Sequence, residues 1–87
     1  MENTISVFIG ATSDEKVKTI ETVREIMKIP GVQKAWELTG SLDLLILASS
    51  TSVSSLNSVV EAVRACKGIR GETTYLVLES HENAKSR

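Results

Sequence analysis

This 87-residue sequence has no excess of charge of one sign and no long apolar run, and it contains few aromatic residues, one cysteine and one histidine. Its ten Lys and Arg residues are scattered among eleven acidic ones, giving a net charge of −1. This argues against direct nucleic-acid binding, because phosphate neutralisation requires clustered basic side chains. No apolar run reaches the roughly 18–20 residues that cross a bilayer, and the first residues lack the basic start of a signal peptide. We therefore expect a soluble, cytoplasmic protein.

The single cysteine and the single histidine offer little chemistry. Cys66 fits a reducing compartment and is expected to pack as a small apolar side chain. His81 lies in a polar tail, residues 81–87, where it is a poor partner for a nucleophile. The sequence contains no metal-ligand spacing and no glycine-rich phosphate loop. We expect neither an enzyme nor a bound metal or cofactor.

Apolar residues recur first with the period of a strand and then with that of a helix. Thr4–Gly10 alternates in this way and predicts a strand. Thr12 and Glu15 have the spacing of a capping box, so a helix is expected to start there. The segment Ile29-Pro30-Gly31 should end it. The apolar stripe predicted for this helix consists of Val17, Ile20, Val23, Ile26 and Met27.

A similar order follows in the rest of the chain. Val32–Leu38 and Asp43–Ala48 read as two strands, joined by a two-residue type II′ hairpin at Gly40-Ser41. A second helix follows candidate N-caps at 49–52, and Lys67-Gly68 ends it. Gly71 marks a possible bulge before a fourth strand, Thr73–Leu78. The apolar positions of the second helix are Val53, Leu56, Val59, Val60, Val63 and Cys66.

The order strand, helix, strand, strand, helix, strand is that of the ferredoxin-like βαββαβ fold, an α+β class. It predicts a four-stranded antiparallel sheet in residues 1–80 with two helices on one face. The third strand, however, is apolar on both parities, and so is the fourth. Leaving four such side chains in water forgoes about 6–12 kcal/mol, comparable to the stability of a small domain. We therefore expect a homodimer in which two sheets pack face to face, a dimeric α/β sandwich.

The turn between the second and third strands is the best candidate for a binding site. Backbone N–H groups near Gly40 could bind a carboxylate, and Asp43 could accept from an ammonium group. Those two charges together describe a free amino acid. The simpler interpretation is a hairpin whose Asp43 accepts hydrogen bonds from nearby backbone amides, and turn chemistry alone favours it.

The run from Ile29 to Leu45, with its Thr39-Gly40-Ser41-Leu42-Asp43 segment, resembles the effector-binding module of the Lrp/AsnC (feast/famine) transcription regulators. Gly68-Ile69 and the later Thr74-x-Leu76-Val77-Leu78 resemble the closing motifs of that family. The similarity runs from about Ile5 to Glu79. Glu72 departs from the pattern, because it stands where the family has the first threonine of Thr-x-Thr.

This resemblance implies sheet-to-sheet dimers that assemble into rings such as octamers or decamers. It also implies an amino-acid effector bound near the Gly-x-x-Asp turn at contacts between dimers. The residues that it nominates for ligand binding are Thr39, Gly40, Ser41, Leu42, Asp43 and Thr74.

Full-length members of the family place a helix-turn-helix domain before this module, whereas the first strand here begins at about Thr4. The resemblance thus implies a stand-alone module that senses amino acids without binding DNA itself. Two other functions stay open. One is a structural partner that forms mixed rings with full-length regulators. The other is a small enzyme of the dimeric α+β barrel type, which would need a polar cluster between sheet and helices.

Overall fold

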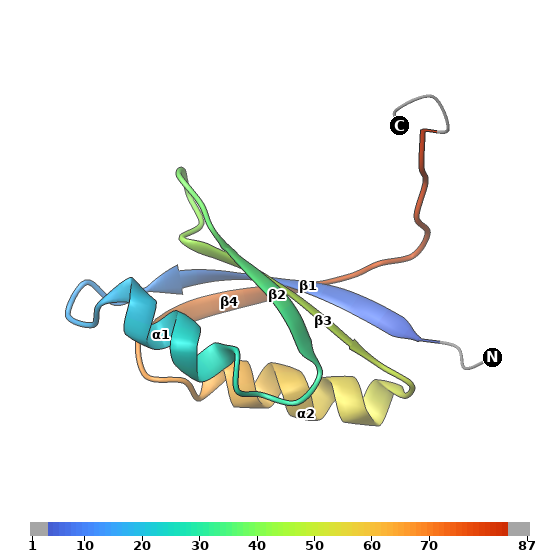
Figure 1. The fold of residues 1–87 in the computed structure, drawn as a ribbon, viewed down its shortest axis with the longest axis horizontal. Coiled ribbons are helices and arrows are strands. Elements are labelled where there is room, and N and C mark those ends of the chain that lie inside the picture. The colour runs from blue at the N-terminus through green and yellow to red at the C-terminus, as the bar shows by residue number, and fades with distance from the viewer. Residues whose placement is uncertain (1–3, 84–87) are drawn as a thin grey trace.

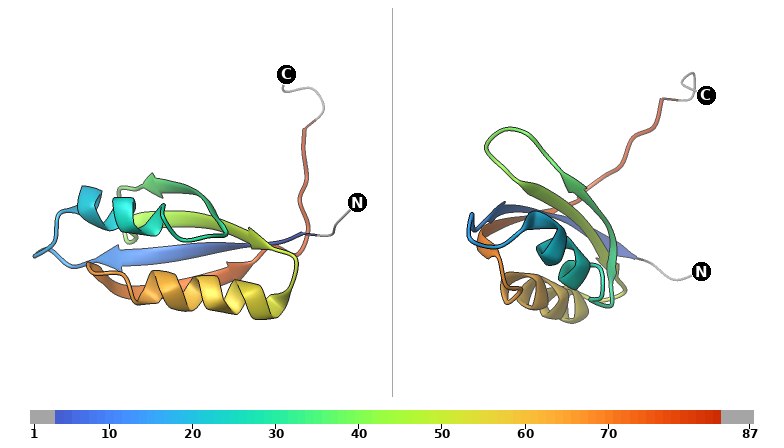
Figure 2. Two further views of the ribbon diagram at one scale, coloured as in Figure 1. Left: turned by 60° about the horizontal axis from the view of Figure 1, so that its bottom comes forward. Right: turned by 60° about the vertical axis from the view of Figure 1, so that its left-hand side comes forward.

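The computed structural model describes residues 4–83, and its six elements follow in the predicted order (Figure 1). The four strands form one antiparallel sheet in the order β2-β3-β1-β4, and both helices cover the same face of it (Figures 1 and 2). The predicted ferredoxin-like fold is therefore confirmed. The elements are β1 (Ile5–Ser13), α1 (Thr19–Ile26), β2 (Val32–Glu37), β3 (Leu44–Ser50), α2 (Val53–Arg64) and β4 (Ile69–Leu76).

The core lies between the sheet and the helices. One parity of the two central strands faces it, so Ile9 pairs with Ile46 and Ala11 with Leu44 among fully buried side chains. The apolar side of α2 packs onto these strands through Leu56, Val59, Val60 and Val63. Burying a large apolar side chain contributes about 1.5–3 kcal/mol, so this layer supplies most of the stability of the subunit. Within residues 4–83, neither helix reaches the length and apolar content that a membrane-spanning helix requires.

The predicted start of the first helix is wrong. Thr12 does not cap a helix, because β1 continues through it and pairs Thr12 with Gly71 of β4. Asp14 instead accepts a hydrogen bond from the Lys16 amide at 2.9 Å, which forms a short turn. The helix α1 begins only at Thr19, and its N-cap residue, Lys18, makes no side-chain capping bond. Pairing with β4 therefore keeps Thr12 in the strand.

The predicted buried stripe of α1 is also partly wrong. Ile26 is fully buried as expected, but Ile20 and Met27 remain 48% and 44% exposed. The helix is rotated so that Thr22 enters the core instead, where it is 1% exposed. Its hydroxyl donates to the Lys67 carbonyl at 3.1 Å, which links α1 to the turn after α2. This hydrogen bond makes the burial of a polar side chain acceptable.

The predicted bounds of the strands need smaller corrections. The β2–β3 connection is longer than a two-residue turn, because the Leu38 amide donates to the Asp43 carbonyl at 2.9 Å and encloses four residues. The strand β4 starts at Ile69, before the predicted Thr73. Its register against β1 shifts next to Gly71, where a bulge was expected. The structure describes the predicted tail, 81–87, only as far as residue 83.

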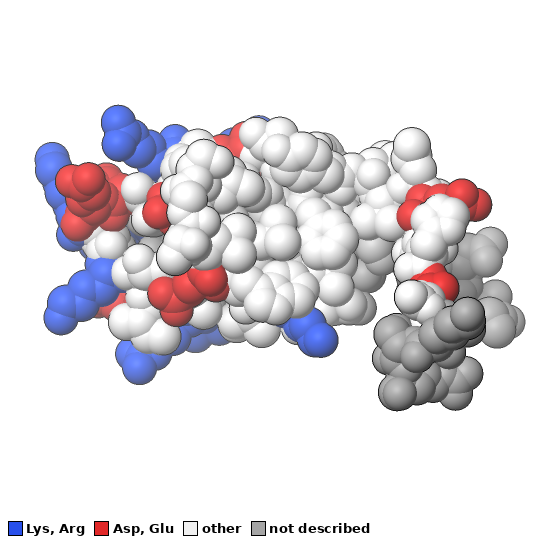
Figure 3. Space-filling view, turned by 90° about the horizontal axis from the view of Figure 1, so that it is seen from above, with Lys and Arg blue, Asp and Glu red and all other residues white. Residues whose placement is uncertain are grey.

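The face of the sheet opposite the helices carries a group of apolar and aromatic side chains, which we call the open face. Phe8 pairs with Leu47 of β3 and with Tyr75 of β4, and the ring centroids of Phe8 and Trp36 are 6.3 Å apart. Figure 3 shows a broad area without charged side chains across the middle of this face. The open face consists of Phe8, Trp36, Leu42, Leu45, Leu47 and Tyr75.

Candidate functional site

The candidate site begins with the hairpin loop that joins β2 to β3. Thr39, Gly40 and Ser41 are all exposed, so their backbone is accessible from solvent. Gly40 has φ of 115°, a left-handed conformation that residues other than glycine rarely adopt. A Cβ placed there would meet no atom within 4 Å. The space around Gly40 is thus open. A glycine is favoured at this position by its backbone conformation and not by crowding.

Asp43 lies at the base of this loop and connects two strands. Its Oδ2 accepts a hydrogen bond from the Ser13 amide at 2.8 Å, and its own amide donates to the Ala11 carbonyl at 2.9 Å. The side chain is half-buried. Asp43 therefore fixes the start of β3 to the end of β1, and the amide that it holds comes from another strand rather than from its own turn.

Leu42 connects the loop to the open face. A Cβ built on Gly10 would lie 2.8 Å from Leu42 Cδ1 and 3.5 Å from Tyr75 Cε2. The side chain of Leu42 thus covers Gly10 next to Tyr75, in space that any larger residue at position 10 would need. The backbone of the loop faces solvent, while this side chain belongs to the sheet surface.

Thr74 does not lie beside this loop within one chain. On β4, Thr74 pairs with Ile9 of β1. Because Ile9 is buried under the helices, the Thr74 side chain is also on the helix side of the sheet. Its hydroxyl donates to Glu72 Oε2 at 3.0 Å, and the side chain of Glu72 is only 8% exposed. The structure therefore places five of the six predicted residues in one loop and the sixth on the opposite face.

The Glu72 carboxylate is neutralised by an arginine from the end of α2. Arg64 donates to Glu72 Oε1 from Nε at 3.0 Å and also pairs with Glu61 at 2.9 Å. The hydrogen bond that Arg64 donates to Glu72 raises the pKa of the Arg64 guanidinium above its ordinary value, and the charge of Glu61 raises it further. The acidic residue at this family position is thus paired on β4, and its charge is not directed at the hairpin loop.

Sequence reasoning missed the partners of these residues. The Ser13 amide and the Arg64 guanidinium are separated in sequence from Asp43 and Glu72, and no local pattern pairs them. The space between sheet and helices is lined by apolar side chains, and Thr22 is the buried polar residue within positions 4–83. In that same part of the chain, no group of three or more His, Cys, Asp or Glu side chains could hold a metal ion.

A four-stranded antiparallel sheet with both helices on one face and an apolar second face is the arrangement of a ferredoxin-like domain (Figure 2). The chain belongs to the Lrp/AsnC ligand-binding domain family, and the match to the family model covers residues 4–86. It is 30% identical over 80 residues to the HTH-type transcriptional regulator LysM of Saccharolobus solfataricus, covering 92% of this chain and 56% of that regulator.

A second relative is an enzyme. A homocitrate synthase of Saccharolobus islandicus is 33% identical over 75 residues, which cover 86% of this chain but 16% of the enzyme. The chain thus spans about half the length of the regulator and a small part of the synthase. Membership of the Lrp/AsnC family identifies this chain as a regulatory domain.

Solved structures share the fold. A transcriptional regulator from Neisseria meningitidis in complex with L-Met has a TM-score of 0.80 at 21% identity, over 95% of this chain and 55% of that one. A protein from Thermus thermophilus has a TM-score of 0.80 at 20% identity, over 91% and 99%. The AsnC structure from E. coli has a TM-score of 0.78 at 19% identity, over 87% and 52%.

Proposed function

We propose that this domain senses a free amino acid in the cytoplasm and transmits its presence through subunit assembly in transcription regulation. The amino acid binds at the hairpin loop, with backbone contacts from Thr39, Gly40, Ser41 and Leu42 and a charged contact from Asp43. The scattered basic side chains and net charge of −1 give the domain itself no direct role in binding DNA.

One observation carries this proposal: an exposed backbone turn and a carboxylate occur three residues apart. Around Gly40 the amides are accessible, and amides of this kind bind carboxylates. Asp43 uses Oδ2 to hold the Ser13 amide, and its second oxygen can accept from an ammonium group. Amide donors and a carboxylate oxygen are the kinds of group that the carboxylate and the ammonium of an amino acid require.

The comparisons support a ligand-binding role in two ways. The regulator from Neisseria meningitidis, which has the same fold, was solved with L-Met. The family domain also resembles segments of two otherwise different proteins, a transcription regulator and a synthase. A property useful to both is the recognition of a small metabolite, whereas the reading of DNA would serve only the first.

The open face supports assembly as a dimer. Tyr75 is 52% exposed and Trp36 39%, next to the half-buried Phe8, Leu45 and Leu47. A second copy of the sheet would cover all of these side chains at once. Thr74 enters the proposal as a contact from another subunit, because it faces away from the loop of its own chain. Dimers would then associate further, into rings or with full-length regulators.

Isothermal titration with each common amino acid tests the sensing role. Asp43→Asn is the informative variant, because the amide oxygen of Asn still accepts from the Ser13 amide while the charge is lost. We expect Asp43→Asn to raise the Kd about 10- to 100-fold, the value of a hydrogen bond to a charged group, with little loss of stability. Asp43→Ala should lose both affinity and stability.

Glu79→Gln is the matched control, because it removes one exposed carboxylate far from the loop in sequence. It should leave the Kd unchanged. Absence of heat with every amino acid, or equal affinity in Asp43→Asn and the wild type, would refute the proposal.

A further inference from the structure

The chain beyond β4 leaves the sheet as an arm, which we define as residues 77–83. The alternation of apolar residues predicts a strand as far as Leu78, but β4 ends at Leu76. The Val77 amide still donates to the Ser6 carbonyl at 3.0 Å, and the chain then separates from β1 (Figure 1). Residues 77–83 are neither helix nor strand. The arm therefore starts with a strand-like sequence that does not extend the strand of its own sheet.

Leu78 is the most exposed apolar residue of the arm. Its side chain is 89% exposed, compared with 56% for Leu76 and 52% for Tyr75. Within residues 4–83, no other large apolar side chain is as exposed. Burial of a leucine side chain changes an equilibrium constant by about 10- to 150-fold. A single subunit forgoes this stabilisation, so a contact with another molecule is favoured.

The sheet edge that leads into the arm lacks the features that prevent pairing with another chain. Residues 73–78 contain no charge, no proline and no glycine. The opposite edge strand, β2, carries Lys34 and Glu37, and its register shifts between Val32 and Lys34. Charges and bulges of this kind keep edge strands from pairing with other chains. The sequence thus protects β2 and leaves the end of β4 accessible.

The arm rises on the same side of the sheet as the open face, away from the helices (Figures 1 and 2). The β2–β3 hairpin rises at the other end of this face (Figure 1). A hollow of about 550 Å³ lies between the arm and the sheet. Its lining includes Phe8 and Leu47 of the open face and Val77 and Leu78 of the arm. The arm and the open face are therefore continuous, and both border the space that a second sheet would occupy.

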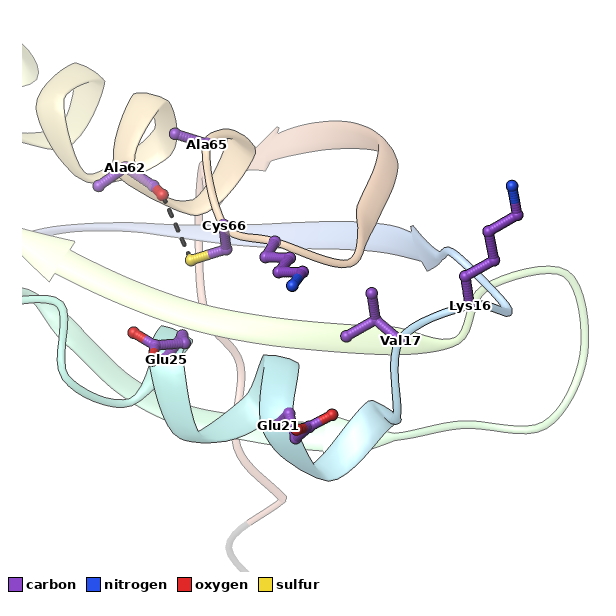
Figure 4. Close-up of a pocket in the computed structure, with 8 residues that line it drawn as sticks. Lys16, Val17, Glu21, Glu25, Ala62, Ala65 and Cys66 are labelled. Atoms are coloured by element: carbon purple, nitrogen blue, oxygen red, sulfur yellow. Dashed lines mark hydrogen bonds between the residues drawn. The ribbon is translucent and has the colours of Figure 1, made fainter.

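The groove between α1 and the end of α2 has a similar volume, about 490 Å³, but a different character (Figure 4). The carboxylates of Glu21 and Glu25 diverge along α1, and the Lys16 side chain points to solvent (Figure 4). The Cys66 thiol donates to the Ala62 carbonyl at 3.4 Å. Because its charged groups do not converge, we place no ligand in this groove.

We propose that the arm binds a second copy of this chain, whose sheet lies on the open face between the hairpin loop and the arm. Leu78 of each subunit is buried against the other subunit, and apolar side chains of that subunit fill the hollow. A two-fold dimer buries both arms in this way. The inference rests on the face-to-face dimer proposed above, and it adds that this dimer depends on a segment outside the sheet.

The length of the arm is sufficient for this contact. At about 3.3 Å per residue, an extended chain of residues 77–83 spans roughly 23 Å. Two sheets that pack face to face are about 10 Å apart. The arm can therefore cross the interface and lie along the second subunit.

Sedimentation velocity of the full chain measures the contribution of Leu78. Leu78→Ser should raise the dimer Kd by about 100-fold or more, because each dimer loses two buried leucines. Val53→Ser is the matched control, since Val53 is 72% exposed on α2, on the helix side of the sheet. It should leave the Kd unchanged. An unchanged Kd in Leu78→Ser, or an equal rise in both variants, would overturn the proposal.

Photo-crosslinking shows which molecule the arm contacts. Benzoylphenylalanine incorporated at position 78 should give covalent dimers on a denaturing gel after illumination at micromolar protein. The same group at position 53 should give none. Crosslinks at position 78 that form only within one chain would mean that the arm lies on its own sheet, and the inference would fail. Capture of another protein without covalent dimers would also overturn it.

Tyr75→Lys separates this inference from the dimer itself, because Tyr75 lies on the open face and not in the arm. If Tyr75→Lys dissociates the dimer and Leu78→Ser does not, the sheets pair without the arm and only the arm inference fails. A wild-type chain that sediments as one subunit would refute both. Amino-acid sensing is tested separately by the titrations, so its failure is distinguishable from either result.

Discussion

Thr22 is a buried polar side chain whose role depends on one hydrogen bond. Thr22→Val keeps the shape but removes the hydroxyl that donates to the Lys67 carbonyl. We expect a loss of about 1–2 kcal/mol in the free energy of unfolding, because the carbonyl loses its donor. Urea denaturation measures this, with Thr51→Val at an exposed position as the control. A Thr22→Val variant as stable as the wild type would show that water replaces the hydroxyl.

Cys66 should ionise at a higher pH than an ordinary cysteine. Burial raises the pKa of its thiol, and the charge of nearby Glu25 raises it further. Because the thiolate is the reactive form, the alkylation rate between about pH 7 and 10 should rise at higher pH than for an unstructured cysteine peptide. Glu25→Gln should move the profile of the folded protein back toward lower pH. An unshifted profile would contradict the role of burial.

Single residues also mark the limit of sequence-based prediction. The apolar spacing of Val17, Ile20, Val23 and Met27 fits a helix, and the helix is present. Spacing alone favoured a face that includes Ile20 and Met27, whereas the structure buries Thr22. The buried Thr22 hydroxyl is hydrogen-bonded to the Lys67 carbonyl, 45 residues away, and no local pattern contains that contact.

Among the elements, the start of α1 is weakly specified. Lys18 occupies the N-cap position with extended backbone angles of −65° and 133°, but makes no capping bond. Lys18→Ser should therefore stabilise the protein by about 0.5–1 kcal/mol. Lys18→Gln is the control, because it removes the unfavourable positive charge at the helix start without adding a cap. Thermal denaturation should rank Ser above Gln and Gln above Lys.

The second helix gives the opposite comparison. Ser52 accepts a hydrogen bond from the Ser55 amide at 3.1 Å, and it is one of the N-cap candidates expected among the Ser and Thr residues at 49–52. Ser52→Ala should cost about 1 kcal/mol by the same measurement. If Ser52→Ala and Lys18→Ser both leave the melting temperature unchanged, capping does not limit either helix.

Element bounds were predictable where a local signal had no competitor. Ser52 capped α2 as expected, whereas Thr12 was drawn into β1 because its backbone pairs with Gly71 across 59 residues. The same extension brings the Ser13 amide to Asp43. Local spacing therefore predicted that Gly40 and Asp43 lie in one loop. The hydrogen bond from the Ser13 amide to Asp43 and the position of Thr74 on the helix side of the sheet depend on strand register instead.

At the scale of the whole molecule, the order of the elements and the two apolar parities of β3 were sufficient to predict the fold and a second apolar face. Leu44 and Ile46 are buried under the helices, and Leu45 and Leu47 belong to the open face. The sequence could not choose between these parities, because both are equally apolar. The choice follows from pairing with β1, where Ile9 faces Ile46 in the core.

The open face leads to a prediction about assembly. Tyr75 is 52% exposed on the edge strand β4, so Tyr75→Lys should be tolerated by the folded subunit. In a two-fold dimer it would place two unpaired charges in an apolar interface. A buried charge without a partner costs at least about 3 kcal/mol, so the dimer Kd should rise by about 100-fold or more.

Sedimentation velocity at micromolar protein measures this shift. Ile20→Lys is the matched control, because Ile20 is 48% exposed on α1, on the opposite side of the sheet. Ile20→Lys should sediment as the wild-type dimer does, while Tyr75→Lys should sediment as a single subunit with unchanged helical content by circular dichroism. A wild-type protein that sediments as one subunit would leave the open face in water and refute the dimer. Dissociation by both variants alike would place the contact elsewhere than on the sheet.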